Sequence, residues 1–319
     1  MAVNAFIFPG QGSQAVGMGR DLAAAFAPAR EVFEEVDEVL KQKLSRLMFE
    51  GPAEELTLTE NAQPALMAMS MAVLRCLEKE AGIVLGDRAA VVAGHSLGEY
   101  SALAAAGTFG IADTARLLRI RGTAMQQAVP PGEGAMAALL GVERDAAEQI
   151  CAEAAESPEG RQVVSVANDN GGGQVVISGT AAAVDRALEI ARARGIKRAL
   201  KLPVSAPFHC ALMAPAAEAM REALAGVTLA APVVPLIANV TAAKVTDPAE
   251  IAARLVEQVT APVRWRESVG TMTALGVTRF IELGAGKVLC GLARRIAPDA
   301  DCLSCGTPAE LEELVKHVG

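Results

Sequence analysis

The sequence predicts an α/β fold in which a parallel β-sheet is covered by helices and one smaller subdomain is inserted. Three observations lead to this prediction. Apolar stretches of strand length alternate with segments of helical periodicity along most of the 319 residues, as in a parallel sheet buried on both faces. Residues 89–103 have the pattern of a buried strand, a sharp turn and a helix. Between residues 135 and 202 the order changes to strand, helix, strand, strand, helix, strand.

The composition is that of a globular protein with an ample core, because 52% of the residues are hydrophobic and 21% are charged. No apolar run approaches the ~20 residues of a membrane span. A net charge of −8 argues against nucleic acid or an anionic membrane as the main partner. We therefore expect one large domain or two smaller ones, with no membrane and no nucleic acid bound.

The cysteine pattern indicates a reducing compartment. Six cysteines are scattered along the chain, and the first ten residues lack the basic segment of a signal peptide. Cys302 and Cys305 have C-x-x-C spacing, but a zinc site would need a second pair or a nearby histidine cluster. We expect a cytoplasmic protein with buried thiols, no metal site and no resident cofactor.

A short apolar run at residues 5–8 predicts the first strand, which ends at Pro9 and Gly10. The loop that follows has the Gly-x-Gly spacing of a dinucleotide-binding turn, but that fold requires a second strand about twenty residues later. Residues 29–40 have helical periodicity instead. We therefore expect the loop to bring a backbone N–H group, that of Gln11, beside the serine turn at residues 94–98 as an oxyanion donor.

Residues 94–98, Gly-His-Ser-Leu-Gly, form a G-x-S-x-G turn. The glycines remove Cβ atoms that would clash in so tight a turn, and Ser96 projects from its tip as a candidate nucleophile. The first N–H groups of the following helix, including that of Leu97, would point at an oxyanion formed beside Ser96. The alternative is an ordinary strand-to-helix turn in which the serine caps the helix.

The helix at residues 111–128 carries an arginine on its apolar face. At 100° per residue, Arg121 falls within the stripe formed by Leu117, Leu118, Ala124 and Met125. A guanidinium on a buried face needs an anionic partner, because an unpaired buried charge is destabilising. That partner is either an internal carboxylate or the carboxylate of a substrate, held by both arms of the guanidinium.

Beyond the turn-rich residues 129–134, the sequence predicts an inserted subdomain. Its predicted elements are strand 135–141, helix 143–155, strand 163–167, strand 174–178, helix 181–195 and strand 196–202. This is the βαββαβ order of a ferredoxin-like unit. We expect a small ferredoxin-like subdomain at residues 132–203 and a large α/β domain formed by residues 1–131 and 204–319.

The large domain resumes with alternating helices and strands. Its predicted elements are helix 211–225, strand 234–239, helices 248–257 and 264–275, strand 278–283, helix 288–296 and a strand near Cys302, besides a helix at 60–81 earlier in the chain. Together with the G-x-S-x-G turn, this order predicts an α/β-hydrolase-like sheet. Ser96 would lie at the carboxyl end of a central strand, where such sheets place their sites.

Ser96 needs a proton acceptor, and the chain offers three histidines. His95 neighbours the serine on extended backbone, so its side chain should point to the other face. His317 is two residues from the end and is expected to fray. His209 follows a rigid, proline-marked segment at the subdomain boundary and is the candidate base, with a buried structural histidine as the alternative.

Six motifs now carry a family resemblance. They are Phe-Pro-Gly-Gln-Gly-Ser-Gln at residues 8–14, Gly-His-Ser-Leu-Gly-Glu-Tyr at 94–100, Arg121, Ser-Ala-Pro-Phe-His at 205–209, Gln258 ahead of Pro-Val-Arg-Trp at 262–265, and Glu-Leu-Gly at 282–284. In their order and over essentially the whole chain, they resemble the malonyl-CoA:acyl carrier protein transacylases of bacterial fatty-acid synthesis.

The resemblance implies that Ser96 takes a malonyl group from coenzyme A as an ester and passes it to the phosphopantetheine thiol of an acyl carrier protein. His209 would be the base, with the backbone carbonyl of Gln258 holding its ring, and the N–H groups of Gln11 and Leu97 would hold the oxyanion. Arg121 would bind the malonyl carboxylate. Met125 and Phe208 would line the substrate pocket, and coenzyme A would enter as part of the substrate.

Two other functions share part of this pattern. A serine esterase of the α/β-hydrolase type has the same G-x-S-x-G turn, but its histidine usually comes late in the chain, which would favour His317. A carrier-binding module with an inactive site would keep the fold without forming an ester on Ser96.

An acidic carrier protein would need a local basic patch on this acidic chain. The first candidate lies at the end of the insert and consists of Arg192, Arg194, Lys197, Arg198 and Lys201. The second consists of Lys287, Arg294 and Arg295. The alternative is that both are solvated helix ends, because Lys and Arg favour the last turn of a helix.

Overall fold

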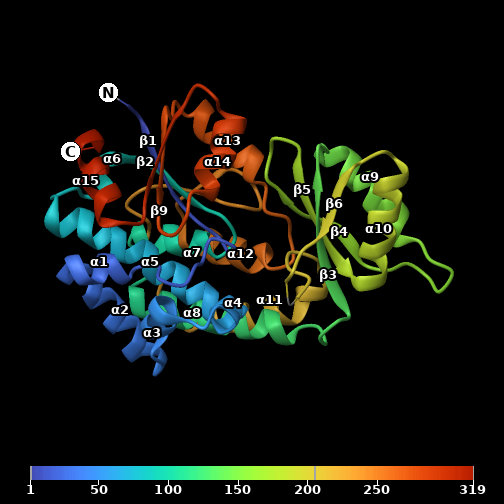
Figure 1. Cartoon of the computed structure of the whole chain (residues 1–319), viewed down its shortest axis with the longest axis horizontal. Helices are drawn as coiled ribbons and strands as arrows, with labels where there is room; N and C mark the ends of the chain where they lie inside the picture. The colour runs from blue at the N-terminus through green and yellow to red at the C-terminus, as the bar shows by residue number, and fades with distance from the viewer. Residues whose placement is uncertain (1, 205, 319) are drawn as a thin grey trace.

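The computed structural model describes residues 2–204 and 206–318. Ser205, the first residue of the motif at 205–209, lies outside the described residues. The chain folds into a large unit, built on a six-stranded sheet, and a small unit, built on a four-stranded sheet (Figure 1). In the described part of the chain, no helix is long and apolar enough to cross a membrane.

The sheet of the large unit has the strand order β10-β9-β1-β2-β7-β8. All neighbours pair in parallel except β7 and β8. The strands are β1 (Asn4–Phe8), β2 (Ala89–Gly94), β7 (Leu236–Ile237), β8 (Lys244–Val245), β9 (Arg279–Leu283) and β10 (Asp301–Cys305). The prediction of an α/β fold with a parallel sheet is therefore confirmed, and β2 lies near its centre.

Helices cover both faces of this sheet because its strands are apolar on both faces. Along β1, Phe6 and Phe8 contribute to one hydrophobic cluster, whereas Ala5 and Ile7 contribute to another. The first cluster is shared with α2 (Ala27–Leu40), α5 (Thr59–Glu80), α7 (Gly98–Ala105), α8 (Ile111–Gln127), α11 (Ala214–Ala225), α12 (Pro248–Gln258) and α15 (Pro308–Val318), and the second with α13 (Trp265–Ala274) and α14 (Val288–Ile296).

The structure corrects several details of the predicted elements. Four short segments that lacked a clear sequence period are helical: α1 (Arg20–Ala25), α3 (Leu44–Glu50), α4 (Ala53–Thr57) and α6 (Leu85–Arg88). The helix predicted at 211–225 begins with the 3₁₀ turn η1 (Ala211–Met213) and continues as α11. The strand expected at 234–239 pairs only over Leu236–Ile237, because the chain turns there into β8. His317, for which fraying is expected, lies in α15 and contacts Glu313.

The small unit is an antiparallel sheet with two helices on one face. Its strands are β3 (Gly134–Leu140), β4 (Val164–Asp169), β5 (Gln174–Thr180) and β6 (Arg198–Lys201), in the order β4-β5-β3-β6, and its helices are α9 (Arg144–Ala155) and α10 (Ala181–Ala193). The helices and one sheet face enclose a separate hydrophobic cluster. The other face, including Met136 and Val176, packs against the large unit.

A short backbone bridge joins the small unit to the large one. Asp169 N–H donates to the carbonyl of Val263 at 2.9 Å, and Val263 N–H donates to the carbonyl of Ala167 at 2.9 Å. Arg266 adds an ion pair to Asp169, also at 2.9 Å. Because β4 is bonded to both units, the carboxyl end of the large sheet faces the side of the small sheet that α9 and α10 leave uncovered.

Close packing at Gly98, the first residue of α7, gives a test of the fold. A Cβ atom at Gly98 would lie 2.2 Å from the carbonyl oxygen of Phe8, whereas one at Gly291 in α14 would have no heavy atom within 4 Å. We expect Gly98→Ala to reduce the free energy of unfolding by about 1–3 kcal/mol or more. Gly291→Ala should raise it by roughly 0.5–1 kcal/mol, because alanine favours helix. Urea unfolding of both variants measures the difference, and equal stabilities would contradict the packing described.

Candidate active site

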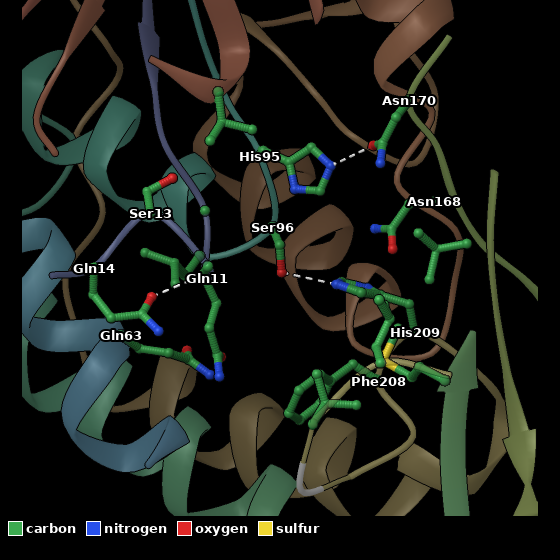
Figure 2. A pocket seen from close by; sticks show the side chains of 18 of the residues that line it. Gln11, Ser13, Gln14, Gln63, His95, Ser96, Asn168, Asn170, Phe208 and His209 are labelled. Carbon is green, nitrogen blue, oxygen red and sulfur yellow. Dashed lines mark hydrogen bonds between the residues drawn. The ribbon is translucent and has the colours of Figure 1, made fainter. Parts of the chain in front are cut away.

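A cavity of about 400 Å³ lies between the two units, at the carboxyl ends of β1 and β2. Figure 2 shows side chains converging on it from the loop after β1, the turn after β2, helix α5, the small sheet and the segment that carries His209. The predicted site residues that line it are Gln11, Ser96, Leu97, Arg121, Met125, Phe208 and His209. Residues separated by up to 198 positions therefore meet at one site.

The turn after β2 holds Ser96 in a left-handed backbone conformation, with φ = 55°. A non-glycine residue adopts this conformation only where its surroundings enforce it. Here Ser96 N–H donates to Asn239 Oδ1 at 2.8 Å, and Asn239 Nδ2 donates to the carbonyl of Gly94 at 2.7 Å. Gln258 Nε2 donates to the carbonyl of Ser96 at 3.0 Å. Two amide side chains thus satisfy the backbone of the strained turn.

Ser96 Oγ lies 2.8 Å from His209 Nε2 (Figure 2). On the other side of the ring, Nδ1 lies 2.9 Å from the carbonyl oxygen of Gln258. A carbonyl oxygen only accepts, so Nδ1 carries the proton and Nε2 is free to accept the serine hydroxyl proton. This is the geometry expected for a serine and its general base.

The imidazole of His209 is neutral at neutral pH. It is 3% exposed, and burial together with the nearby positive charge of Arg121 lowers its pKa to about 3. Its own backbone is also in the left-handed region, with φ = 57°. Both partners of the hydrogen bond are therefore held on constrained backbone, which fixes their relative position.

Arg121 reaches the site from α8, as its place on the helical wheel predicted. It is 1% exposed, and its Nη2 donates to Ser96 Oγ at 3.1 Å and to Gln258 Oε1 at 2.8 Å. Nη1 donates to Gln63 Oε1 at 2.8 Å. No carboxylate of the described residues forms an ion pair with Arg121. The alternative expectation, an ion pair with an internal carboxylate, is therefore wrong.

Glu99 is the nearest buried acid, and it contacts amides rather than Arg121. Gln258 Nε2 donates to its Oε2, and Asn239 N–H donates to its Oε1 at 3.4 Å. Burial raises the pKa of Glu99 to about 8, so the carboxyl group is largely protonated at neutral pH. The positive charge of Arg121 therefore remains largely uncompensated.

Gln11 and Leu97 lie on the same wall of the cavity as Ser96. In residues 2–204 and 206–318, neither backbone N–H donates to a protein acceptor. Leu97 is also the N-cap of α7, where the first N–H groups of a helix carry positive partial charge. The two N–H groups are thus available to an oxygen atom bound beside Ser96.

His95 lines the cavity but does not contact the serine hydroxyl. Its Nε2 lies 2.9 Å from Asn170 Oδ1, so the ring spans from the turn to the small unit (Figure 2). Burial lowers its pKa. The expectation that its side chain points to the opposite face from the site is wrong, because the ring lines the same cavity as Ser96.

The two predicted basic patches are both at the surface, but they differ in how many charges are free. In the first, Arg194 pairs with Glu153 at 2.5 Å and Lys201 with Asp185 at 2.8 Å. The other three side chains of this patch are exposed and have no ion pair in the described part of the chain: Arg192, Lys197 and Arg198. In the second, Lys287 pairs with Glu310 at 2.8 Å, Arg294 donates to the carbonyl of Cys302 at 2.9 Å, and Arg295 packs against Gly172.

The sequence analysis did not identify Gln63, Glu99 and Asn239 as residues of the site. A signal was available for each of them. Gln63 and Glu99 are polar residues within apolar helical segments, the same kind of signal that identified Arg121. Asn239 ends the strand predicted at 234–239, at the edge of the sheet where sites gather.

This arrangement can deprotonate a serine hydroxyl, hold a developing oxyanion and bind an anion beside it, which are the requirements of acyl transfer to or from a carboxylate-bearing group. In the part of the chain that the structure describes, no group of three or more His, Cys, Asp or Glu side chains is gathered as a metal site would require.

Comparisons with known proteins agree with this chemistry. The acyl transferase domain model matches residues 5–295. Malonyl CoA-acyl carrier protein transacylase of Bacillus subtilis strain 168 is 48% identical over 98% of this chain and 96% of its own length. The crystal structure of acyl-carrier-protein-S-malonyltransferase from Bartonella henselae is 57% identical, covers 99% of both chains and has a TM-score of 0.96.

A second similar structure contains a partner protein. It is a malonyl-transacylase in complex with its type II PKS acyl-carrier protein, 41% identical to this chain, with a TM-score of 0.94 over 99% of this chain and 100% of the other. The match of the family model to most of the chain, and of these relatives to nearly all of it, agrees with the site geometry. The chain therefore belongs to the acyl transferase family.

Proposed function

We propose that this chain is a malonyl-CoA:acyl carrier protein transacylase, which moves a malonyl group from coenzyme A to the phosphopantetheine thiol of an acyl carrier protein in fatty-acid synthesis. The observation that carries the proposal is the buried Arg121 guanidinium, 3.1 Å from Ser96 Oγ and without a carboxylate partner among the described residues. Such a site favours an acyl group that brings its own carboxylate. The names of the similar proteins support the same activity.

The proposed mechanism has two half-reactions through one ester. Ser96 Oγ attacks the thioester carbon while His209 Nε2 takes its proton, and the N–H groups of Gln11 and Leu97 stabilise the oxyanion. The C–S bond then breaks, and the coenzyme A thiolate leaves with the proton from His209. The carrier thiol attacks the ester in the same way, returning the proton to Ser96. No resident cofactor is needed, because coenzyme A and phosphopantetheine enter as parts of the substrates.

The serine esterase alternative is not favoured. It would use a histidine late in the chain, but His317 is exposed on α15 and contacts Glu313 at 3.2 Å. His209 instead lies within hydrogen-bond distance of Ser96.

We also infer the finer organisation of the fold and its location. The strand order β4-β5-β3-β6, with two helices over a separate core, supports a ferredoxin-like subdomain at residues 132–203 inserted in an α/β-hydrolase-like domain of residues 1–131 and 204–319. All six cysteines are free thiols, which supports the proposed cytoplasmic location.

The central test is the ester on Ser96. Treatment with malonyl-CoA should add one malonyl group to the intact protein, and Ser96→Ala should add none. Without any carrier protein, labelled coenzyme A should exchange into malonyl-CoA, because the first half-reaction is complete in itself. Mass spectrometry and exchange of label measure the two effects. A wild-type protein that gains no mass and shows no exchange until carrier is added would contradict the proposal.

The pH dependence of ester formation tests the state of His209. Because burial and the charge of Arg121 lower its pKa to about 3, the imidazole stays in the free-base form when the pH falls below its ordinary value near 6.5. The rate of ester formation should therefore stay nearly constant from pH 8 to about pH 5. Single-turnover rates over this range measure it. A loss of rate with a midpoint near pH 6.5 would mean that His209 titrates normally.

The same pKa shift predicts the direction of stability change. Between about pH 6.5 and pH 3, the unfolded chain binds a proton at His209 that the folded chain does not. The contribution of this group to stability is therefore present above pH 6.5 and is lost as the pH falls from there towards 3.

We propose that the carrier docks on the first basic patch, where Lys197 and Arg198 are exposed and unpaired in the described residues. Their strand β6 leads directly into Leu202, Pro203 and Val204, which line the cavity. A phosphopantetheine arm entering there would pass from a basic rim to the apolar wall of the small sheet. Arg192, which also has no ion pair among the described residues, lies in the last turn of α10. The second patch, at Lys287, is the alternative docking surface.

Charge reversal tests this docking surface. Lys197→Glu with Arg198→Glu should raise the apparent KM for carrier protein and flatten the salt dependence of transfer, because rim charges act mainly on association. Ester formation from malonyl-CoA should change far less than transfer to carrier. A matched control is Lys79→Glu with Lys244→Glu, which changes the same charge at exposed lysines that do not line the cavity. An equal effect of both double variants would place the docking surface elsewhere.

A further inference from the structure

Gln63 is a buried residue whose side chain holds Arg121 from the side opposite Gln258. It lies in the first turns of α5, is 1% exposed and lines the cavity. Its Oε1 accepts from Arg121 Nη1 at 2.8 Å, and its Nε2 donates to Met125 Sδ at 3.6 Å. The guanidinium is thus held between Gln63 on α5 and Gln258 on α12.

The orientation of the Gln63 amide follows from the chemistry of its neighbours. A guanidinium has only donors, and a thioether sulfur accepts weakly and cannot donate. The amide oxygen must therefore face Arg121, and the amide nitrogen must face Met125. No other orientation satisfies both contacts, so Met125 fixes Gln63 and Gln63 fixes Arg121.

Among the described residues, the three groups that accept hydrogen bonds from Arg121 are all uncharged. A buried arginine is usually paired with a carboxylate, because the unpaired charge is destabilising. Among the described residues, however, the partners of Arg121 are two amide oxygens and the serine hydroxyl. The ring of Tyr100, 5.7 Å from the guanidinium carbon, adds only a weak attraction. Glu99 bonds to Gln258 instead of to Arg121.

We propose that Gln63 is a specificity-determining positioning residue, which orients the guanidinium of Arg121 toward the acyl group without neutralising its charge. Only an acyl group with its own carboxylate then neutralises that charge. This inference rests on the proposed function, since it concerns the acyl group that Ser96 receives. It assigns the selection against neutral acyl groups to an uncharged side chain in contact with Arg121, in addition to Arg121 itself.

Gln63→Glu is the sharpest test, because it keeps the shape of the side chain and places a negative charge of the protein itself beside Arg121. A carboxylate beside Arg121 would be ionised, since an adjacent guanidinium lowers its pKa. We expect the rate of Ser96 acylation by malonyl-CoA to fall on the order of 100-fold, because the new carboxylate competes with that of the substrate. Acylation by labelled acetyl-CoA should stay within a few-fold of the wild-type rate.

Stability and reactivity measurements separate this effect from damage to the fold. Because the variant pairs a buried charge, its melting temperature should equal or exceed that of the wild type. Its rate of reaction with phenylmethanesulfonyl fluoride, an uncharged serine reagent, should not fall. Gln63→Met removes the acceptor but adds no charge, so malonyl acylation should fall about 10-fold while malonyl stays preferred over acetyl.

Helix α8 offers a matched control. Arg119 is also held by neutral groups, Gln42 Oε1 and Asn61 Oδ1, but it does not line the cavity. Gln42→Glu therefore makes the same chemical change beside another arginine of the same helix. It should leave the ratio of malonyl to acetyl acylation unchanged.

The outcomes are distinguishable. If Gln63→Glu slows malonyl, acetyl and sulfonyl fluoride reactions equally, or leaves the malonyl to acetyl ratio unchanged, the inference is wrong. If Gln63→Glu does not fold, Gln63→Met decides, and an unchanged malonyl rate in that variant overturns the inference. If the wild-type protein forms no malonyl ester, the proposed function fails instead.

Discussion

The strained turn at Ser96 is the constraint on which the rest of the site depends. A serine with φ = 55° projects its hydroxyl from the end of β2, but the turn leaves its backbone groups without partners from the sheet. Asn239 and Gln258 provide those partners, and each has a second task. Asn239 ties the turn to Gly94, while Gln258 holds Arg121 with its side chain and His209 with its backbone carbonyl. The nucleophile proposed here, its base and its anion-binding group are therefore positioned by one small network.

The sequence predicted most of the fold because its periodicities are strong. Helix α14 has the predicted bounds, and β1, α8 and α12 each differ from theirs by one residue. What it could not predict depends on tertiary contacts. The short helices between residues 20 and 57 have too few turns to show a period, and β7 is cut to two residues by the antiparallel turn into β8.

The same division applies to the site. Ser96, His209 and Arg121 could be found because each is unusual where it stands: a serine between glycines, a histidine after a rigid segment, a charge on an apolar stripe. Their partners Gln63 and Asn239 carry a weaker signal, and only tertiary packing brings Gln63 on α5 to Arg121 on α8 and Asn239, after β7, to the turn. The same holds for the contact between His95, which follows β2 of the large sheet, and Asn170, which follows β4 of the small sheet.

The nearness of Arg121 to His209 has a consequence for the resting protein. Its unbalanced positive charge is one of the causes that lower the pKa of the imidazole, and thereby weaken it as a base. A bound carboxylate would cancel that charge and restore basicity at the moment when a proton must be removed. Neutral thioesters bring no such charge, so they meet a weaker base and a less activated serine. The arginine can thus couple the binding of a carboxylate-bearing acyl group to the basicity of His209, so that the base is strongest when that group is in place.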